Sequence, residues 1–314
     1  MSSFSVLVVN WNGREDLRAC LRSLGGQSDR DFEIVVVDNG SSDGSLEMVR
    51  DGFPEVVLID AGENLGFAEG NNRGIPRCRG EWVICLNCDA EAEPGFVEAL
   101  RAAASESAAD VGMLQARMVF KQRPHIINSA GVLLRSGGRF VDRGFDEPVE
   151  RYRERVEIFC PSAGAAAYRR TMLEAIRLDT GYFDRTFFMY FEDVDLGWRA
   201  RLAGWSALYV PTATVKHAFH GSASRKGQHF VALHCKKNRI RTLLKNASWP
   251  LVGRGVPLTT FDTAWSLLRG GPASLGAIGQ AVRDGLAQRG EVERVRRVSR
   301  QDIERRFVLP LRHA

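Results

Sequence analysis

Two polar segments of the chain follow apolar runs and carry side chains that bind metal ions. Asp89 ends the segment Asn87-Cys88-Asp89, and a carboxylate oxygen is a hard ligand suited to Mg²⁺ or Mn²⁺. His217 ends two short β-branched runs, and a neutral imidazole also binds divalent metals well. Simpler interpretations stay open, because Asp89 can cap a helix expected near Pro94 and a lone His is more often structural. One carboxylate binds a metal weakly, so substrate phosphates would supply further oxygens.

A second group of carboxylates follows the aromatic run Tyr182–Phe191. Glu192, Asp193 and Asp195 open an expected helix, where the helix dipole alone would favour acidic residues. A carboxylate beside aromatic side chains can also deprotonate a hydroxyl group as that group attacks an electrophile. Asp193 and Asp195 point in different directions on a helix, so we expect only one of them to be a general base.

The first two apolar runs end in residues relevant to nucleotide binding. Asp38 is suited to accept hydrogen bonds from a base or a ribose, although it is equally suited to form a turn. The first run is followed by Asn10-Trp11-Asn12-Gly13, which lacks the G-x-G-x-x-G phosphate cradle. This absence argues against an NAD-dependent dehydrogenase. Arg225 and Lys226 follow His217 and could close over phosphates as a basic loop.

The first 120 residues alternate apolar runs with segments of helical spacing. Continuous β-branched runs separated by helices indicate parallel strands buried on both faces, with ligands bound beyond the carboxyl ends of the strands. Residues 121–160 are less regular and predict a β-rich insertion. The four runs predicted as strands are Ser5–Asn10, Glu33–Asp38, Glu55–Asp60 and Glu81–Leu86.

The composition is that of an ordinary globular protein, with 314 residues, 44% of them hydrophobic and 26% charged. No apolar stretch approaches the roughly 18 residues that span a bilayer, and no basic segment opens a signal peptide. We therefore expect a cytoplasmic protein. Its six cysteines are expected to be reduced and mostly buried, although Cys85 and Cys88 form a CxxC pair.

The positive charge is concentrated at the C-terminal end. Residues 251–314 contain eleven Arg against six acidic residues, and the whole chain carries +5. Residues 292–298 alternate apolar and basic side chains, which predicts peripheral contact with an anionic membrane surface. A solvated helix face is the open alternative. Few aromatic residues accompany the Arg residues, so we expect no nucleic-acid binding.

The order of these motifs resembles glycosyltransferase family 2, especially its bacterial rhamnosyltransferase-like branch. The resemblance extends from Ser5 to about Asn246. It rests on V-V-N-W-N-G, V-V-V-D-N-G-S-x-D-G-S, N-L-G-F-A-x-G-N-N-x-G, L-N-x-D-A, F-M-Y-F-E-D-V-D-L-x-W-R and the following His.

The resemblance implies an α/β GT-A fold, in which a Rossmann-like, mostly parallel sheet is flanked by helices and followed by a C-terminal helical extension. Residues 1–246 would form the catalytic domain, with a nucleotide-binding half at about 1–120 and an acceptor half at about 121–246. Residues 247–314 would form the basic, mostly helical extension.

The activity implied is inverting transfer of a sugar from a nucleotide-sugar donor to a glycan, a lipid-linked saccharide or a related acceptor, with Mg²⁺ or Mn²⁺. The branch favours dTDP-L-rhamnose as donor. UDP-hexoses, UDP-galactofuranose and a catalytically inactive sugar-nucleotide-binding module stay open as alternatives. The sequence does not indicate an oligomeric state.

The resemblance also implies roles for individual residues. Asp193 matches the catalytic base, with Glu192 and Asp195 in support. Asp89 and His217 match the metal ligands, and Asn87 stands where the family motif has another Asp. Arg225 and Lys226 would contact the phosphates. The implied nucleotide-binding residues are Asn10, Asn12, Asp38, Asn39, Asn64, Gly66, Asn71, Asn87 and Cys88.

Overall fold

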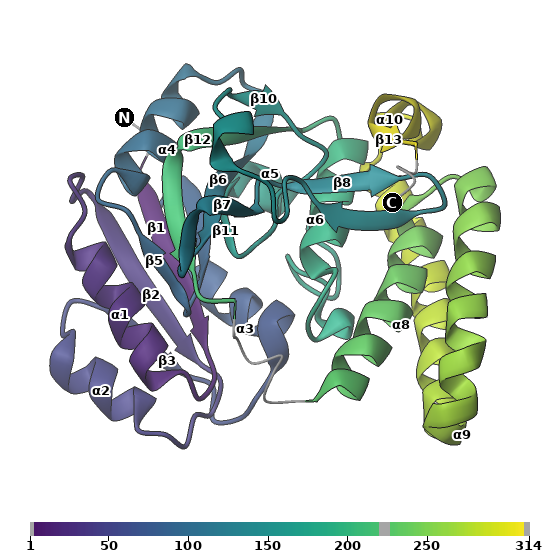
Figure 1. Ribbon diagram of the computed structural model, residues 1–314, viewed down its shortest axis with the longest axis horizontal. Helices are drawn as coiled ribbons and strands as arrows, with labels where there is room; N and C mark the ends of the chain where they lie inside the picture. The colour runs from purple at the N-terminus through teal and green to yellow at the C-terminus, as the bar shows by residue number, and fades with distance from the viewer. Residues whose placement is uncertain (1–2, 220–226, 311–314) are drawn as a thin grey trace.

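The computed structural model describes residues 3–219 and 227–310, leaving out the side chains of residues 228 and 258–274. Within these residues, ten strands form one mixed sheet with helices on both faces, and a helical region lies beside it (Figure 1). The order along the sheet is β10-β12-β6-β11-β4-β1-β2-β3, with β5 paired to β12 and β7 to β6. Arg225 and Lys226 lie outside the described residues.

The N-terminal half of the sheet is parallel, as the four apolar runs predict. Its strands are β1 (Phe4–Asn10), β2 (Phe32–Asp38), β3 (Val57–Asp60) and β4 (Trp82–Asn87). Alternate side chains enter opposite cores, so Val6 and Val8 pack on one face and Leu7 on the other. Helices α1 (Arg14–Gly25), α2 (Ser45–Gly52) and α4 (Phe96–Glu106) cover the first face, and α3 (Gly66–Gly74), extended by η1 (Ile75–Arg77), covers the second.

Beyond β4 the sheet becomes mixed, because β11 (Ala165–Arg169) lies antiparallel between β4 and β6 (Val111–Phe120). The two short β-branched runs that end at His217 form one strand, β12 (Ser206–His217), with a register shift between Val210 and Thr214. Short β5 (Ala90–Ala92) pairs with its end. Helices α5 (Arg170–Ala175) and α6 (Glu192–Leu202) follow β11, separated by η3 (Arg185–Phe187).

The predicted β-rich insertion is confirmed. It contains β7 (Arg123–Ser129), the hairpin β8 (Val132–Arg135) and β9 (Arg139–Asp142), η2 (Val149–Arg151) and β10 (Val156–Glu157). A second sheet joins this hairpin to the C-terminal end of the chain, because β13 (Val308–Leu309) pairs with β8.

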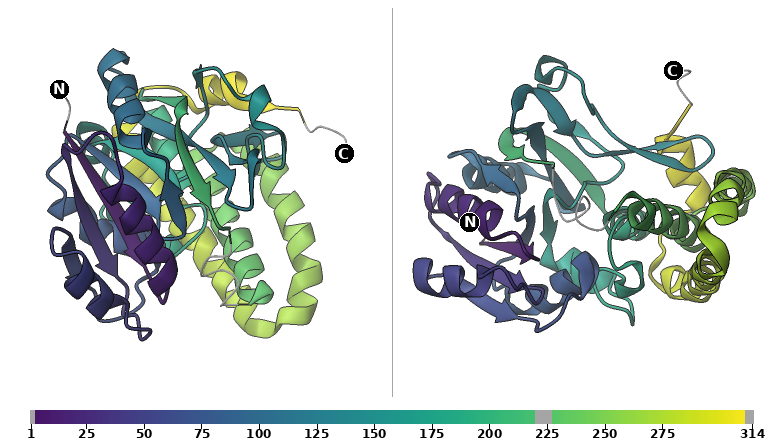
Figure 2. Two further views of the ribbon diagram at one scale, coloured as in Figure 1. Left: turned by 60° about the vertical axis from the view of Figure 1, so that its left-hand side comes forward. Right: turned by 60° about the horizontal axis from the view of Figure 1, so that its bottom comes forward.

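The C-terminal region consists of α8 (Gln228–Asn246), α9 (Trp249–Val295) and α10 (Arg300–Phe307). Helix α9 folds back on itself (Figure 2). Its two ends are in contact, since the guanidinium carbon of Arg289 lies 4.2 Å from the ring centre of Trp249. A straight helix would separate these residues by about 60 Å. Helices α8, α9 and α10 pack on α6 around Trp198, Leu243 and Val292. Among the described residues, no helix has the length and apolar character needed to cross a membrane.

Candidate active site

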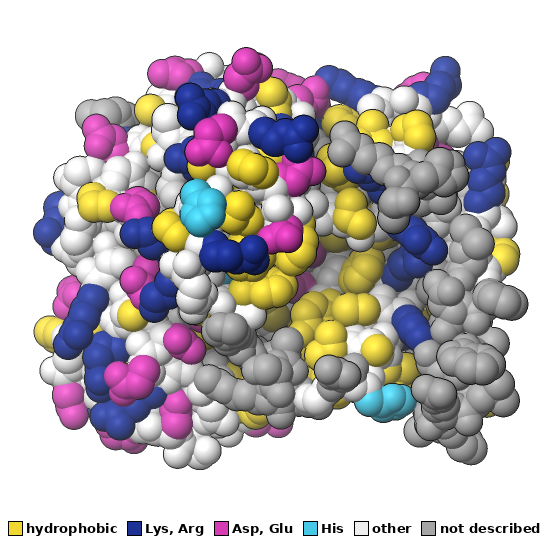
Figure 3. All heavy atoms as spheres, viewed as in Figure 1, with side chains coloured by type: hydrophobic (Ala, Val, Ile, Leu, Met, Phe, Trp, Pro, Cys, Tyr) yellow, Lys and Arg dark blue, Asp and Glu magenta, His cyan; other side chains and the backbone are white. Residues whose placement is uncertain are grey.

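A cavity of about 660 Å³ lies beyond the carboxyl ends of β1 and β4, with α8 on its other side. Hydrophobic side chains gather in the hollow between the sheet and the helical region (Figure 3). Most of the residues implied by the family resemblance line this cavity, although they come from distant parts of the sequence. They are Asn39, Asn64, Gly66, Asn87, Cys88, Asp89, Glu192, Asp193 and His217.

Asp38 is buried in a hydrogen-bonded turn and does not line the cavity. Its carboxylate accepts hydrogen bonds from the backbone N–H and the hydroxyl of Ser41, both at 2.7 Å, and from the Asn10 amide at 2.9 Å. The Asn12 side chain accepts a hydrogen bond from the backbone of Ser42. This geometry fits the interpretation of Asp38 as a turn residue. Contact of Asn10, Asn12 and Asp38 with a nucleotide stays a prediction.

Gly66 brings the start of α3 against the aromatic segment 188–191. It has a φ of 79°, and a β-carbon at this position would lie 2.5 Å from the carbonyl oxygen of Phe188. Asn64 accepts a hydrogen bond from the Gly66 N–H, and the Asn39 amide donates to the Gly66 carbonyl at 2.9 Å. The buried Asn71 donates to Phe67 at the base of the same helix.

Asp89 and His217, which the family resemblance implies as metal ligands, lie side by side at the strand ends. The His217 Nε2 atom lies 3.0 Å from Asp89 Oδ1 and 3.2 Å from the side-chain nitrogen of Asn87. The other ring nitrogen, Nδ1, lies 2.9 Å from Asn128 Oδ1. Asn128 thereby orients the imidazole, as a carbonyl partner does for many metal-binding histidines. Asn128 is not predictable from the sequence, because no motif surrounds it in its own segment.

Charge in the cavity is strongly one-sided. Five carboxylates line it, and no Lys or Arg does so among the described residues. Those residues also contain no group of three His, Cys, Asp or Glu side chains that would bind a metal by itself. A diphosphate in this cavity would therefore need positive charge from elsewhere. The five carboxylates belong to Asp16, Asp89, Asp142, Glu192 and Asp193.

Asp193 lies on the cavity wall at the start of α6. Its carboxylate accepts hydrogen bonds from the backbone N–H groups of Ala163 at 3.0 Å and Val194 at 2.7 Å. Burial raises the pKa of Asp193, although these two N–H groups stabilise its charged form. Burial and then the charge of Asp193 raise the pKa of Glu192 well above its ordinary value. Asp193 is therefore the better candidate to be ionised at neutral pH.

The segment before Asp193 has a strained backbone. Phe188, Tyr190 and Phe191 have φ values of 66°, 69° and 72°, in the left-handed region that bulky residues rarely adopt. The buried Asn238 of α8 holds this segment by donating to the carbonyls of Phe187, Met189 and Tyr190. Asn238 is a further residue whose role no motif in the sequence indicates.

Asp195 does not line the cavity. Its fully buried carboxylate lies 2.9 Å from both Arg199 and Lys245 and accepts a hydrogen bond from Asn246 at 2.8 Å. Lys245 also contacts Asp184 at 2.7 Å. This network joins α6 to α8, so the geometry gives Asp195 a contact with the supporting helix rather than with the cavity.

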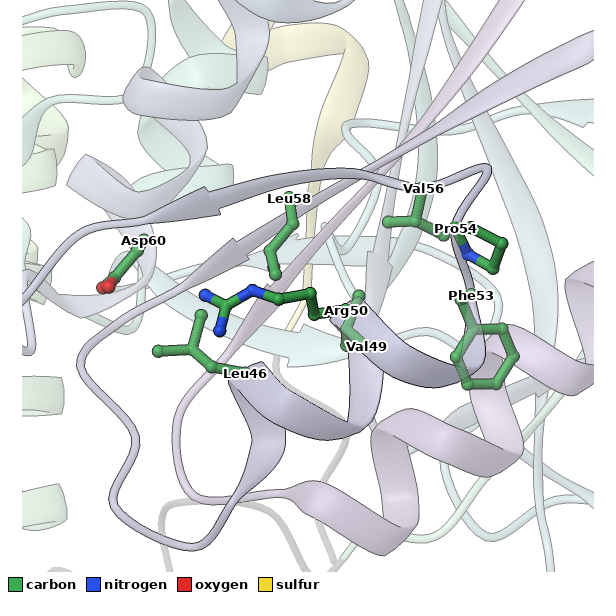
Figure 4. A pocket seen from close by; sticks show the side chains of 8 residues that line it. All are labelled: Leu46, Val49, Arg50, Phe53, Pro54, Val56, Leu58 and Asp60. Atoms are coloured by element: carbon green, nitrogen blue, oxygen red, sulfur yellow. The ribbon is translucent and has the colours of Figure 1, made fainter.

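A smaller hollow of about 260 Å³ lies at the sheet edge, between α2 and β3. Figure 4 shows that Leu46, Val49 and Arg50 of α2 face Leu58 of β3 there. None of the residues implied by the family resemblance lines it. The 660 Å³ cavity is therefore the candidate active site.

The sequence profile described as Glycosyl transferase family 2 matches residues 5–177 of the chain. The chain belongs to glycosyl transferase family 2. Over 268 residues, this glycosyltransferase is 31% identical to the N-acetylglucosaminyl-diphospho-decaprenol L-rhamnosyltransferase of Mycobacterium tuberculosis, an alignment covering 78% of this chain and 85% of that protein. It is also 27% identical to the putative glycosyltransferase EpsH of Bacillus subtilis, over 70% of this chain and 61% of EpsH.

Solved structures confirm the fold of the family 2 enzyme. Its TM-score is 0.62 with GalNAc-T7 bound to UDP, GalNAc and Mn²⁺, at 16% identity over 78% of this chain and 48% of that one. With mannosyltransferase PcManGT of Pyrobaculum calidifontis the TM-score is 0.55, at 17% identity over 94% and 86% of the two chains. With S. aureus TarS in complex with UDP-GlcNAc it is 0.56, at 18% identity over 93% and 82%.

Proposed function

We propose that this glycosyltransferase transfers L-rhamnose from dTDP-L-rhamnose to a hydroxyl group of a lipid-linked saccharide, with inversion at the anomeric carbon. The proposed catalytic mechanism rests on one observation. The Asp193 carboxylate lies on the wall of the cavity that Asp89 and His217 also line. The donor and acceptor classes rest on the 31% identity with the mycobacterial rhamnosyltransferase.

Asp193 is the proposed general base. As the acceptor oxygen forms its bond to the anomeric carbon, Asp193 takes the hydroxyl proton, and the bond from that carbon to the donor diphosphate breaks. A single base with in-line attack inverts the stereochemistry, unlike the paired carboxylates of retaining glycosidases. The raised pKa of Asp193 makes it a stronger base than an exposed Asp.

Asp89 and His217 are the proposed ligands of Mn²⁺ or Mg²⁺. They fit this role because one carboxylate oxygen and one imidazole nitrogen lie 3.0 Å apart in a cavity whose described lining has no Lys or Arg. A divalent cation bound there would offset the charge of the departing diphosphate. Arg225 and Lys226 are proposed to contact the same phosphates.

Two other functions stay open for the same fold. A UDP-hexose or UDP-galactofuranose transferase would use the same base and metal ligands with a different donor. An inactive sugar-nucleotide-binding module is the other alternative, but the presence of Asp89, Asp193 and His217 in one cavity favours an enzyme.

Peripheral membrane contact through the basic C-terminal end is a further part of the proposal. Val292 is buried and Val298 packs against the same core, so residues 292–298 direct apolar side chains inward. Arg294 has 67% of its side chain exposed and forms long ion pairs with Asp179 and Glu291, which anionic lipids would compete with. The expected contact is electrostatic, and flotation with anionic vesicles should weaken as salt rises. Equal flotation with neutral and anionic vesicles would contradict it.

Calorimetry with dTDP-L-rhamnose, UDP-glucose, UDP-galactose and UDP-galactofuranose, each with Mn²⁺ and with EDTA, tests the donor. The proposal expects Mn²⁺-dependent binding that is tightest for dTDP-L-rhamnose. Preference for a UDP-sugar would replace the donor and leave the base unaffected. Binding without transfer to any saccharide tested would favour the inactive module.

A further inference from the structure

Asp142 is a cavity carboxylate for which the proposed chemistry has no use. It lies at the end of β9, in the insertion, whereas Asp89 follows β4 and Asp193 begins α6. It lines the cavity together with Val132, Phe140 and Val141 of the same hairpin. The β8–β9 hairpin therefore forms a wall of the active site that carries one charged side chain.

This wall is fixed from behind by the C-terminal region. The turn at Gly137 and Gly138 has positive φ values, and Arg239 of α8 donates to both of their carbonyls at 2.8 Å. The Ser136 N–H donates to the carbonyl of Leu309 in β13 at 2.8 Å. A hairpin held on both sides presents its inner side chains in a defined position.

The same wall is joined to the helix that carries the proposed base. The ring of Phe140 packs edge-to-face against Phe191 and Trp198, with ring centres 5.5 Å and 5.9 Å away. Asp193 follows Phe191 closely in the sequence, so β9 and the start of α6 form one packed unit. Desolvation and then the negative charge of Asp193 raise the pKa of Asp142 to about 6. Asp142 therefore lies within electrostatic range of the proposed base.

The charge of Asp142 limits what it can bind. Asp142 lines the cavity with an exposed side chain, and its side-chain partner among the described residues is the hydroxyl of Ser129, not a Lys or Arg. A carboxylate in this position repels the donor diphosphate and accepts hydrogen bonds from a neutral group that is rich in hydroxyls. A saccharide with its hydroxyls directed at Asp193 has that chemistry.

We propose that Asp142 accepts a hydrogen bond from a hydroxyl group of the acceptor saccharide and so helps to select the acceptor. This inference rests on the glycosyl transfer proposed above. Asp142 acts in binding, and Asp193 keeps the role of base. The loss of one charged hydrogen bond to a bound sugar is typically about 1.5–3 kcal/mol, which corresponds to roughly a 10- to 150-fold rise in acceptor KM.

The test uses full-length protein with Mn²⁺, dTDP-L-rhamnose and a short-chain N-acetylglucosaminyl-diphospho-lipid as acceptor probe. We expect Asp142→Ala, which removes the acceptor oxygens, to raise the acceptor KM at least tenfold, and Asp142→Asn, which keeps a neutral amide acceptor, to raise it less. In both variants kcat should stay within threefold of wild type and the dTDP affinity should be unchanged. The matched control is Asp146→Asn, because Asp146 is an exposed carboxylate near the same hairpin, paired with Arg123 outside the cavity. Asn tolerates the positive φ of 62° at this position.

An acceptor KM of Asp142→Ala equal to that of wild type would overturn the inference. A kcat of either variant as low as that of Asp193→Asn would also overturn it, because Asp142 would then be a base. Loss of dTDP binding in Asp142→Asn would assign it to the donor site. A folded wild-type protein that binds dTDP-L-rhamnose but glycosylates no saccharide would instead overturn the proposed function, and this inference with it.

Discussion

The side-chain amide of Asn238 donates a hydrogen bond to the backbone carbonyl of Tyr190 at 2.9 Å. The same amide contacts the carbonyls of Phe187 and Met189, so one buried side chain of α8 holds the strained segment that leads to Asp193. Left-handed conformations of bulky residues cost roughly 1–3 kcal/mol each. This segment keeps its shape because the surrounding contacts compensate for that cost.

We therefore expect Asn238→Ala to lower both stability and activity. Buried carbonyls without a donor cost about 1–3 kcal/mol, measurable by urea unfolding. Release of the segment also shifts Asp193, so kcat should fall at least tenfold while the Kd for dTDP stays within threefold. Asn246→Ala is the matched control, since it removes another buried α8 amide that contacts Asp195 and not the aromatic segment. Equal kcat losses in both variants would contradict a specific effect on Asp193.

Glu192 should destabilise the native protein at neutral pH. Its pKa is raised in the folded state by burial and by the charge of Asp193, so the folded protein binds its proton more tightly than the unfolded chain does. The contribution of Glu192 to the free energy of unfolding is therefore most favourable below the ordinary Glu pKa of about 4.3, and it decreases as the pH rises above that value. Glu192→Gln removes the titration and should raise the Tm at pH 7–8 by a few degrees.

Thermal unfolding between pH 4 and pH 8 checks this expectation. The gain from Glu192→Gln should shrink towards pH 4, where Glu192 is protonated in the folded state and mostly protonated in the unfolded chain. Glu15→Gln is the control, because Glu15 also lies in the first turn of a helix but has 72% of its side chain exposed. A gain that does not vary with pH would contradict the assignment.

Asn128 should affect metal binding through His217. Asn128→Ala leaves Nδ1 of the imidazole without its partner at 2.9 Å, so the ring is free to turn away from Asp89. Loss of such a partner typically weakens metal affinity about 10–100-fold. Mn²⁺ titration in the presence of dTDP measures the effect. His125→Ala, which removes an exposed imidazole from the same strand, should leave the affinity unchanged, and equal affinities in wild type and Asn128→Ala would contradict the proposed ligand set.

The sequence predicts the parallel half of the fold and the convergence of its polar strand ends. Buried β-branched runs identify β1 to β4, and the ends of parallel strands meet at one sheet edge, which brings Asp89, Gly66 and Asn39 into the lining of one cavity. The family resemblance adds His217 and Asp193, which lie far from these strands in sequence. The antiparallel insertion of β11 was not predicted, because a buried run of small residues does not encode its direction.

Residues that reach the site from elements without a motif could not be identified from strand patterns or from the family resemblance. Asn128, Asp142 and Asn238 lie in segments without a motif, and each reaches the site through packing between elements distant in sequence. For Asp38, in contrast, the sequence suggests a binding role that the described contacts do not include. Its position at a strand end is compatible with nucleotide binding, but its described hydrogen bonds close a turn with Ser41.

Asp193→Asn separates catalysis from donor binding. The amide keeps the size of the carboxylate but cannot accept the acceptor proton, so kcat for transfer should fall by about 10²–10⁴-fold. The measurement is initial rhamnosyl transfer by wild type and Asp193→Asn to N-acetylglucosaminyl-diphospho-lipid, with the Kd for dTDP-L-rhamnose determined on the same preparations. We predict loss of transfer with an unchanged Kd. Transfer by Asp193→Asn within threefold of the wild-type rate would show that Asp193 is not the base.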